Sequence, residues 1–424
     1  MIRTYMPGEF NPERPTRGAS PPAVVSTVAE IIADVAKRGD AAVREYTQKF
    51  DGCSPGSFEV SDEEMTSAMN AVDAEFMETM TRAAANIEAY HSRQIRHGFV
   101  MTPGDGIVLG QRIMPIARVG IYVPGGTAPY PSSVLMNCIP AKIAGVSELI
   151  LATPPSKDGS VDAGILAAAT IAGVGKVLKI GGAQAIAAMA YGTETIPRVD
   201  KITGPGNAYV AEAKRQVFGI VGIDMIAGPS DILVIADEHA NPEFVAADML
   251  SQCEHGEDSI AVLITDSKTL ASKVCSEIED QLPKLPREVI ARASIDSHGK
   301  IIIVDSMEQA FDISNELAPE HLEVYLAEPF AYLDKVKNAG SVFLGRNTPE
   351  AVGDYYSGTN HTIPTSGAAW FASPLSVDDF IKKSSFTYYT EDALCMSGAD
   401  IVRFAEKESF AAHAAAVSRR LARR

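Results

Sequence analysis

The sequence predicts an α/β protein with two parallel-sheet layers and a helical C-terminal tail. Short, near-continuous apolar runs alternate with Ala-rich helical segments, which is the pattern of a parallel sheet covered by helices on both faces. This alternation occurs twice along the chain. After about residue 375 the chain is charged and helical with little core of its own, so we expect the tail to dock on the body or on a partner subunit.

Helices are expected before the first strand. Apolar residues from Val24 to Val35 recur at helical spacing, Gly39 closes that helix, and a second helical pattern covers residues 61–94. The first group of expected strands comprises residues 119–123, 149–152, 176–180 and 231–236. The second group comprises residues 260–264, 300–304, 322–326 and 341–344. Joins near residues 122 and 236 divide the chain into a discontinuous domain (1–122 with 237–374), a second domain (123–236) and a tail (375–424).

Composition excludes several classes of protein. The 424 residues are 46% apolar and 21% charged, and the formal charge of −17 argues against a nucleic-acid binder, which needs clustered Lys and Arg. Five scattered cysteines without a C-x-x-C motif fit a reducing compartment. The N-terminus does not resemble a secretory signal, and the longest apolar region, residues 134–151, is interrupted by polar residues. We therefore expect a cytoplasmic protein without a membrane span.

Glycine-rich turns follow three of the expected strands, at residues 124–126, 181–184 and 204–207. Each precedes a helical stretch, where backbone N–H groups and the helix N-terminus favour a phosphate group. None is a G-x-G-x-x-G fingerprint. Each turn alone is equally well explained as a tight strand-to-helix connection, but three in neighbouring connections favour a ligand crevice.

Gln252 and His255 are spaced to share one face of an expected helix. An imidazole nitrogen and an amide oxygen can bind a borderline metal such as zinc, although a capping or surface histidine is the alternative. Asp354 lies in a polar, glycine-punctuated segment after a strand and is either a ligand or a turn residue. Glu408 and His413 lie on an expected tail helix and, taken alone, fit a solvated face.

Glu320 and His321 stand side by side between a helical stretch and a strand. Neighbouring residues on regular backbone point in different directions, so the two could serve different atoms of one substrate as proton-transfer groups. The alternative is a partly exposed pair at an element boundary. Pro319 stiffens the turn before them, and a strand starts directly after them. These patterns predict a two-domain protein with a metal site and an acid/base pair, and they do not identify a reaction.

Taken together, these segments resemble the histidinol dehydrogenase family. The resemblance runs in order over nearly the whole chain, through residues 119–126, 180–185, 202–207, 224–230, 251–255, 318–321, 353–355, 358–361 and the tail around His413. It implies an NAD-dependent, zinc-binding homodimer with two Rossmann-like domains, whose tails are exchanged between subunits. The implied reaction is the oxidation of L-histidinol through an aldehyde to L-histidine. The missing G-x-G-x-x-G is no departure, because this family binds the dinucleotide without it.

The resemblance also assigns roles to residues. Glu320 and His321 match the catalytic pair, with His321 as general base and Glu320 as activator of water. The matching zinc ligands, one ion per subunit, are Gln252, His255, Asp354 and, from the other subunit, His413. The matching substrate positions are Ser230, Glu408, His321 and the four metal-site residues. The matching NAD positions are Tyr122, Gln184 and Asn207.

Two positions depart from the family's usual pattern, and two other functions compete. Cys253 stands where a small alanine is usual, and Trp370 follows a segment that often carries a basic residue, so both could change the pocket. The first competitor is a related zinc and NAD dehydrogenase of another hydroxymethyl compound, such as a sulfopropanediol, although Glu408 would repel a sulfonate. The second is a non-catalytic, metal-dependent binding protein with two lobes, which would not need Glu320 and His321.

Overall fold

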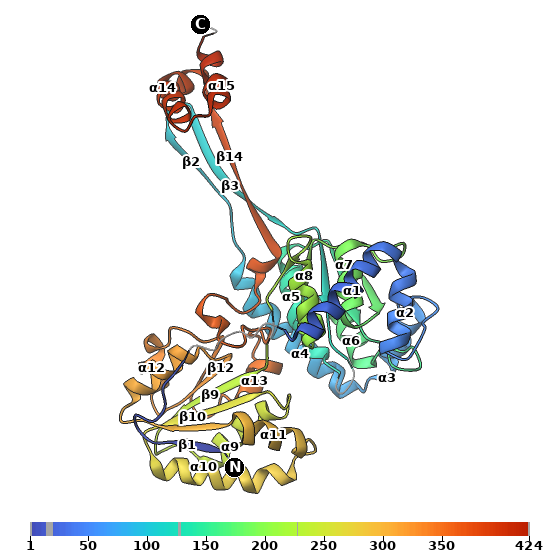
Figure 1. Ribbon diagram of the computed structural model, residues 1–424, viewed down its shortest axis with the longest axis vertical. Coiled ribbons are helices and arrows are strands. Elements are labelled where there is room, and N and C mark those ends of the chain that lie inside the picture. Colours follow the sequence, from blue (N-terminus) through green and yellow to red (C-terminus); the bar gives the residue numbers. More distant parts are fainter. Residues whose placement is uncertain (1, 14–19, 126–128, 227, 423–424) are drawn as a thin grey trace. The chain divides into compact units, whose positions relative to one another are not determined.

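The structure is a computed structural model that describes residues 2–13, 20–125, 129–226 and 228–422 (Figure 1). These residues form two compact units. The first comprises Met1–Gln94 and Ile116–Phe380, and the second comprises Ile95–Pro115 and Ile381–Arg424. Among the described residues, no helix combines the length and apolar character needed to cross a membrane.

The first unit contains two parallel sheets. The six-stranded sheet has the order β1-β11-β10-β9-β12-β13. Its strands are β1 (Arg3–Tyr5), β9 (Asp231–Ala236), β10 (Ile260–Thr265), β11 (Lys300–Ile303), β12 (His321–Tyr325) and β13 (Ser341–Leu344). The five-stranded sheet has the order β6-β5-β4-β7-β8. Its strands are β4 (Arg118–Tyr122), β5 (Glu148–Thr153), β6 (Lys176–Lys179), β7 (Lys201–Thr203) and β8 (Gly222–Ile223).

Helices cover both faces of the five-stranded sheet because its strands are apolar on both sides. One face packs on α3 (Asp62–Ala71), α4 (Ala74–His91), α5 (Pro131–Ala144) and α6 (Ala163–Ala172). The other packs on α1 (Pro22–Arg38), α2 (Asp40–Phe50), α7 (Gly182–Tyr191) and α8 (Ala208–Val217). Successive residues of one strand face opposite sides of the sheet, as Ile121 and Tyr122 do.

The six-stranded sheet is covered in the same way (Figure 1). Against one face lie α9 (Pro242–Cys253), α10 (Lys268–Gln281) and α11 (Glu288–His298), and against the other lies α12 (Met307–Leu317). The short helix α13 (Glu350–Tyr355) follows β13. Single 3-10 turns are formed by η1 (Ser92–Gln94), η2 (Leu282–Lys284), η3 (Pro329–Lys335), η4 (Ala368–Trp370) and η5 (Val377–Phe380).

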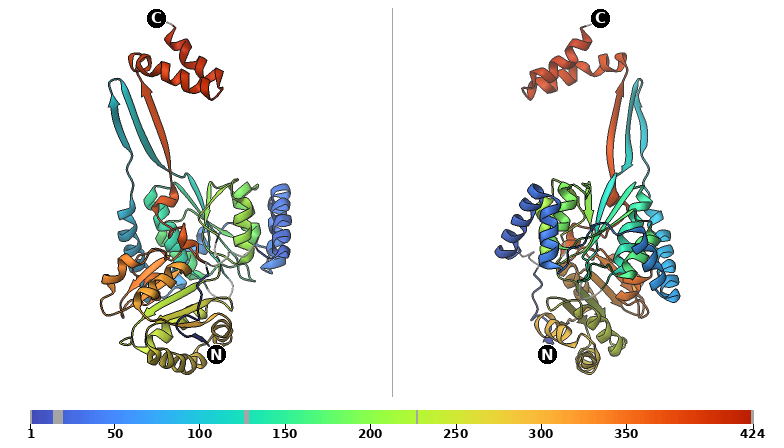
Figure 2. Two further views of the ribbon diagram at one scale, coloured as in Figure 1. Left: turned by 60° about the vertical axis from the view of Figure 1, so that its left-hand side comes forward. Right: turned by 90° about the vertical axis from the view of Figure 1, so that its right-hand side faces the viewer.

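The second unit has little core. Its antiparallel sheet has the order β14-β3-β2, with β2 (Phe99–Gly104), β3 (Ile107–Pro115) and β14 (Ile381–Tyr389), and Figure 2 shows these strands as a long, narrow ribbon. The helices α14 (Glu391–Lys407) and α15 (Ala411–Leu421) pack on each other. On these two helices only Ala393, Gly398 and Ala414 are buried among the described residues.

The α/β prediction is confirmed, and three details of it were wrong. Residues 231–236 were grouped with the first set of strands, but β9 pairs with β10 and β12 in the six-stranded sheet. Residues 118–122 form β4 of the five-stranded sheet. β4 and β9 therefore each belong to the sheet on the other side of the domain edge expected at residue 122 or 236. The helical pattern of residues 61–94 breaks at Val72, where Asp73 caps a new helix by accepting the N–H of Phe76.

The tail is α-helical only from Glu391 onward. Residues 381–389, expected within the helical tail, form β14 and pair with β3 over the whole length of the strand. Phe386, Thr387, Tyr388 and Tyr389 have high strand propensity, and pairing with a partner far away in the chain decides their conformation.

Candidate active site

Glu320 and His321 are buried at the start of β12. The helix α12 ends at Ala318, whose positive φ of 49° is unusual for a residue with a side chain. Pro319 follows, and His321 is then the first residue of a strand held between β9 and β13. Both members of the pair therefore lie on fixed backbone, and the alternative of a partly exposed boundary pair was wrong.

Asp231, at the start of β9, holds both members of the pair. Its carboxylate accepts the backbone N–H of Glu320 at 2.8 Å, and its own N–H donates to Oε2 of Glu320 at 3.0 Å. Its carbonyl oxygen lies 3.0 Å from Nδ1 of His321. A carbonyl can only accept, so Nδ1 carries a proton and Nε2 is the basic nitrogen of the neutral ring. Oε2 of Glu320 lies 3.8 Å from Nδ1, which makes the two side chains close neighbours.

Carboxylates surround the basic nitrogen of His321. Nε2 lies 3.5 Å from Oδ1 of Asp354, and it is a buried atom with no hydrogen-bond partner among the described residues. Burial lowers the pKa of His321, but Glu350, Glu320 and Asp354 outweigh it and raise the pKa well above 6.5. The ring is therefore a stronger base than free imidazole.

The predicted metal-site residues of the first unit come from two helices. Gln252 is fully buried in the last turn of α9, and His255 is exposed just beyond the C-cap, where its N–H donates to the carbonyl of Gln252 at 3.2 Å. Asp354 lies on α13, one turn after Glu350. His321, Glu350 and Asp354 each offer one ligand atom within 4.8 Å of the other two, which makes them a group able to hold a metal ion.

The three predicted cofactor residues stand around the carboxyl ends of parallel strands. Tyr122 ends β4 and accepts the N–H of Gly182 with its hydroxyl at 3.0 Å. Gln184 lies in the first turn of α7, and both polar atoms of its buried amide lack a partner among the described residues. Asn207 follows β7 and caps α8 by accepting the N–H groups of Tyr209 and Val210. Gly126 of the first glycine-rich turn lies outside the described residues.

The remaining predicted residues divide between the two units. Ser230 directly precedes Asp231, and its carbonyl accepts the N–H of Ile260 at 3.0 Å. Glu408 and His413 belong to the second unit, where both are exposed and the ring of His413 lies against Phe410. Of the predicted residues, Asp354 and His321 lie close together in the first unit. Gln252 joins them through Glu350, which contacts its amide.

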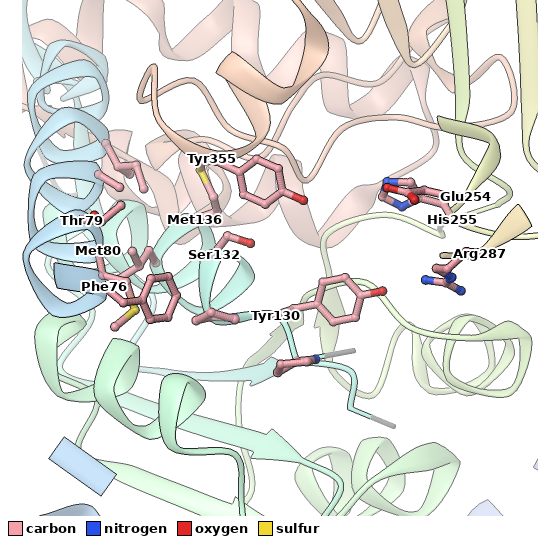
Figure 3. Close-up of a pocket in the computed structure, with 15 residues that line it drawn as sticks. Phe76, Thr79, Met80, Tyr130, Ser132, Met136, Glu254, His255, Arg287 and Tyr355 are labelled. Atoms are coloured by element: carbon pink, nitrogen blue, oxygen red, sulfur yellow. The ribbon is translucent and has the colours of Figure 1, made fainter. Parts of the chain in front are cut away.

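A cavity of about 360 Å³ opens beside His255 (Figure 3). At one end it is apolar, with Phe76 and Met80 of α4 and Met136 of α5. At the other end lie the polar side chains of Glu254, His255 and Arg287. Tyr130, Ser132 and Tyr355 add hydroxyl groups between the two ends. The cavity therefore offers a small organic ligand an apolar pocket next to polar partners.

Comparisons with known proteins find relatives that match nearly the whole chain. The sequence model described as histidinol dehydrogenase matches residues 14–421. The histidinol dehydrogenase of Geobacillus kaustophilus is 55% identical over 93% of this chain and 93% of its own length. That of Clostridium acetobutylicum is 53% identical over 92% of this chain and 91% of its own. The crystal structure of histidinol dehydrogenase from Elizabethkingia anophelis superimposes with a TM-score of 0.92 at 41% identity, covering 99% of this chain and 98% of that one.

The chain belongs to the histidinol dehydrogenase family. The resemblance and the prediction of an oxidoreductase are thereby confirmed. A non-catalytic binding protein, the second competing function, is not supported, because the match to a family of dehydrogenases covers nearly the whole chain.

The two departures from the histidinol dehydrogenase pattern lie in a buried core and on a short 3-10 helix. Cys253 is fully buried in the core beneath α9, where burial raises the pKa of its thiol to about 11. Trp370, on η4, donates its indole N–H to the carbonyl of Glu316 at 3.4 Å. Neither side chain lines the cavity beside His255. We find no structural reason for either residue to change the ligands.

Sequence reasoning missed Asp231 and Glu350, two polar residues of this histidinol dehydrogenase site. Asp231 follows the predicted Ser230, and Glu350 precedes Asp354 by one helical turn. The spacing of Glu350 and Asp354 was a usable signal, since both face the same side of a helix. His361 is a satisfied turn histidine, with Nδ1 2.9 Å from the carbonyl of Asp354 and Nε2 3.1 Å from the hydroxyl of Ser133.

The buried carboxyl groups predict how stability depends on pH. Burial raises the pKa of Glu320 from 4.5 to about 8 and that of Glu350 to about 7. Between about pH 5 and pH 8 the folded chain therefore holds more protons than the unfolded chain, and its free energy of unfolding falls as pH rises. Each group contributes at most about 1.4 kcal/mol per pH unit. Thermal unfolding with chelator present should give midpoints that decrease over this range, less steeply for Glu320→Gln, and a rising midpoint would contradict the assignment.

Proposed function

We propose that the protein oxidises L-histidinol through L-histidinaldehyde to L-histidine, with NAD as hydride acceptor and one Zn²⁺ per subunit. The observation that carries the proposal is the Glu320–His321 pair, which Asp231 fixes beside Asp354 in a chain of this family. The alternative of a sulfopropanediol or a similar substrate is not favoured, because relatives at 50–55% identity are named histidinol dehydrogenase.

His321 acts as the general base. Its Nε2 takes the hydroxyl proton of the alcohol as hydride leaves the carbon, and the surrounding carboxylates stabilise the imidazolium that results. Glu320 prepares water for attack on the aldehyde-level intermediate. Burial raises its pKa to about 8, which makes its carboxylate a stronger base toward water than that of an exposed glutamate. Two groups with different tasks agree with a two-step oxidation.

The donor set of the site fits a zinc ion. Gln252, His255 and Asp354 supply an amide oxygen, an imidazole nitrogen and a carboxylate oxygen, all of which are ligand types for zinc. A bound ion would orient the imidazole and amino groups of the substrate, which is a template role. His413 from a second subunit completes the set of ligands. Glu408, which comes from that second subunit as well, faces the substrate's amino group. Ser230 contacts the substrate beside the catalytic pair.

The five-stranded sheet supplies the NAD site. The unpaired amide of Gln184 stands at the N-terminus of α7, and Tyr122 and Asn207 lie at the ends of the adjacent strands β4 and β7. A polar group without partners at a helix N-terminus suits a pyrophosphate or a carboxamide. The six-stranded sheet carries the catalytic pair. Cofactor binding and proton transfer are thus divided between the two sheets.

The second unit serves a homodimer. Large apolar side chains are exposed on both its ribbon and its helices, with Val100 67%, Met396 71% and Phe404 70% exposed. Exposed apolar surface on an element without its own core favours a covering partner. A second copy of the chain is that partner, and the exchange of tails brings His413 into the site. The five cysteines are free, which supports a reducing compartment, the cytoplasm.

The test is the stoichiometry of the reaction. Purified protein with L-histidinol and excess NAD should form two NADH per histidinol, followed at 340 nm with product identified by chromatography. Chelation should abolish turnover, and added Zn²⁺ should restore it. One NADH per alcohol would contradict the two-step oxidation, and no turnover by zinc-loaded protein would contradict the substrate.

A further inference from the structure

Three elements around the site each contribute a pair of polar side chains at a spacing that places both on one face. These pairs are Asp248 and Gln252 on α9, His321 and Glu323 on β12, and Glu350 and Asp354 on α13. One member of each pair has a task in the proposed reaction. The other three are carboxyl groups without one, although Glu323 and Glu350 are only 2% and 3% exposed. Buried carboxyl groups are costly, so their retention calls for an explanation.

Glu350 faces the amide of Gln252. Both carboxylate oxygens of Glu350 lie 2.8 Å from the amide nitrogen of Gln252 in the orientation that satisfies both groups. In its ionised form Glu350 accepts hydrogen bonds and cannot donate them, so it draws the NH₂ group of Gln252 toward itself. The oxygen of Gln252 is then the end of the amide that faces away from Glu350. A metal ion binds an amide through oxygen, and the orientation of this amide therefore decides whether Gln252 can be a ligand.

Glu350 is itself held in place. Its backbone N–H donates to Oε1 of Glu323 at 2.8 Å. The carboxyl group of Asp248 lies close enough to that of Glu323 to add to the effect of burial, and together they raise the pKa of Glu323 well above 4.5. Asp248 lies one helical turn before Gln252 on α9, so Glu323 stands between the backbone of α13 and the helix that carries Gln252. The bond from Glu323 therefore fixes the first turn of α13, the backbone from which the side chain of Glu350 reaches the amide.

We infer that Glu350 is a positioning residue, which orients the amide of Gln252 so that its oxygen is offered to the metal ion. This inference rests on the proposed function, in which Gln252 is a ligand. The competing arrangement makes Glu350 a ligand itself, together with His321 and Asp354. The positioning role is favoured because both oxygens of Glu350 are already occupied by the nitrogen of Gln252.

The experiment measures zinc affinity of the full-length protein by competition with a chromophoric chelator, without reference to turnover. Glu350→Gln removes the preference for one orientation of the Gln252 amide, because the new amide at position 350 can form a hydrogen bond with either end of it. Its dissociation constant for Zn²⁺ should rise about 10–100-fold, the usual effect of losing a partner that orients a ligand. The absorption spectrum of bound Co²⁺ should also change. The matched control is Glu212→Gln, since buried Glu212 accepts the amide of Gln216 at 2.7 Å on α8, and its zinc affinity should equal that of the wild type.

A double variant tests the orientation directly and does not depend on how well Glu350→Gln folds. In Gln252→Glu with Glu350→Gln, the new amide donates to the new carboxylate, and an oxygen at position 252 again faces the metal ion. Zinc affinity should return to within about 10-fold of the wild type. The inference is overturned if Glu350→Gln binds zinc normally, if it binds zinc more weakly than Gln252→Ala, or if the double variant fails to bind. If the wild type binds no zinc, the proposed function falls together with the inference.

Discussion

Replacing His321 by asparagine is expected to lower kcat for NADH formation by about 10²–10⁴-fold, the usual contribution of a positioned general base. Asparagine has no group that can take the proton of an alcohol. Its Nδ2 can still donate to the carbonyl of Asp231, which now accepts from Nδ1 of the ring. The variant should therefore fold, since only the basic Nε2 is lost. Steady-state kinetics at 340 nm gives the loss in kcat.

Two measurements separate a lost base from a damaged site. Zinc content should stay at one ion per subunit, because His321 is not among the proposed ligands. Hydride transfer should also be slow in a single turnover, which would locate the defect in the chemical step. A variant with normal turnover would remove His321 from the mechanism, and a variant without zinc would make it a ligand, as its place near Glu350 and Asp354 allows.

The sequence predicts the position of Glu320 and His321 in the fold well, because local features place both residues. Pro319 and the apolar run that starts at Leu322 fix both residues at the beginning of a strand, and β12 starts at His321. The same features say nothing of Asp231, which lies 89 residues before Glu320. Its contacts exist because β9 and β12 are neighbours in the sheet, and the order of strands is not written in any one segment.

The limits of the fold prediction have the same cause. The run at residues 231–236 is apolar on both sides, as strands of both sheets are, so its composition cannot decide which sheet it joins. The strand β14 depends on its pairing with β3 in the same way. Glu350 was missed for a different reason, since a buried carboxyl group is recognisable only when its partner, the amide of Gln252, is in view.

Mixing two inactive variants is expected to restore activity if the site is shared between subunits. His321→Asn damages the first unit of the chain, and His413→Ala damages the second. Each homodimer has two defective sites and should be nearly inactive. A mixed dimer has one site with both lesions and one site with neither, because an exchanged tail brings an intact His413 to an intact His321.

The size of the recovery follows from counting subunits. Equal amounts that dissociate and reassociate at random give about half mixed dimers, each with one working site, so the mixture should show about a quarter of wild-type activity. Mixing His321→Asn with His255→Asn is the control, since both lesions then lie in the first unit and no combination of chains yields an intact site. No recovery in the first mixture, with subunit exchange verified by mass spectrometry, would place His413 outside the partner's site. Recovery only in the first mixture would explain why the sequence carries a tail without a core: its exposed apolar side chains and its histidine both serve the second copy of the chain.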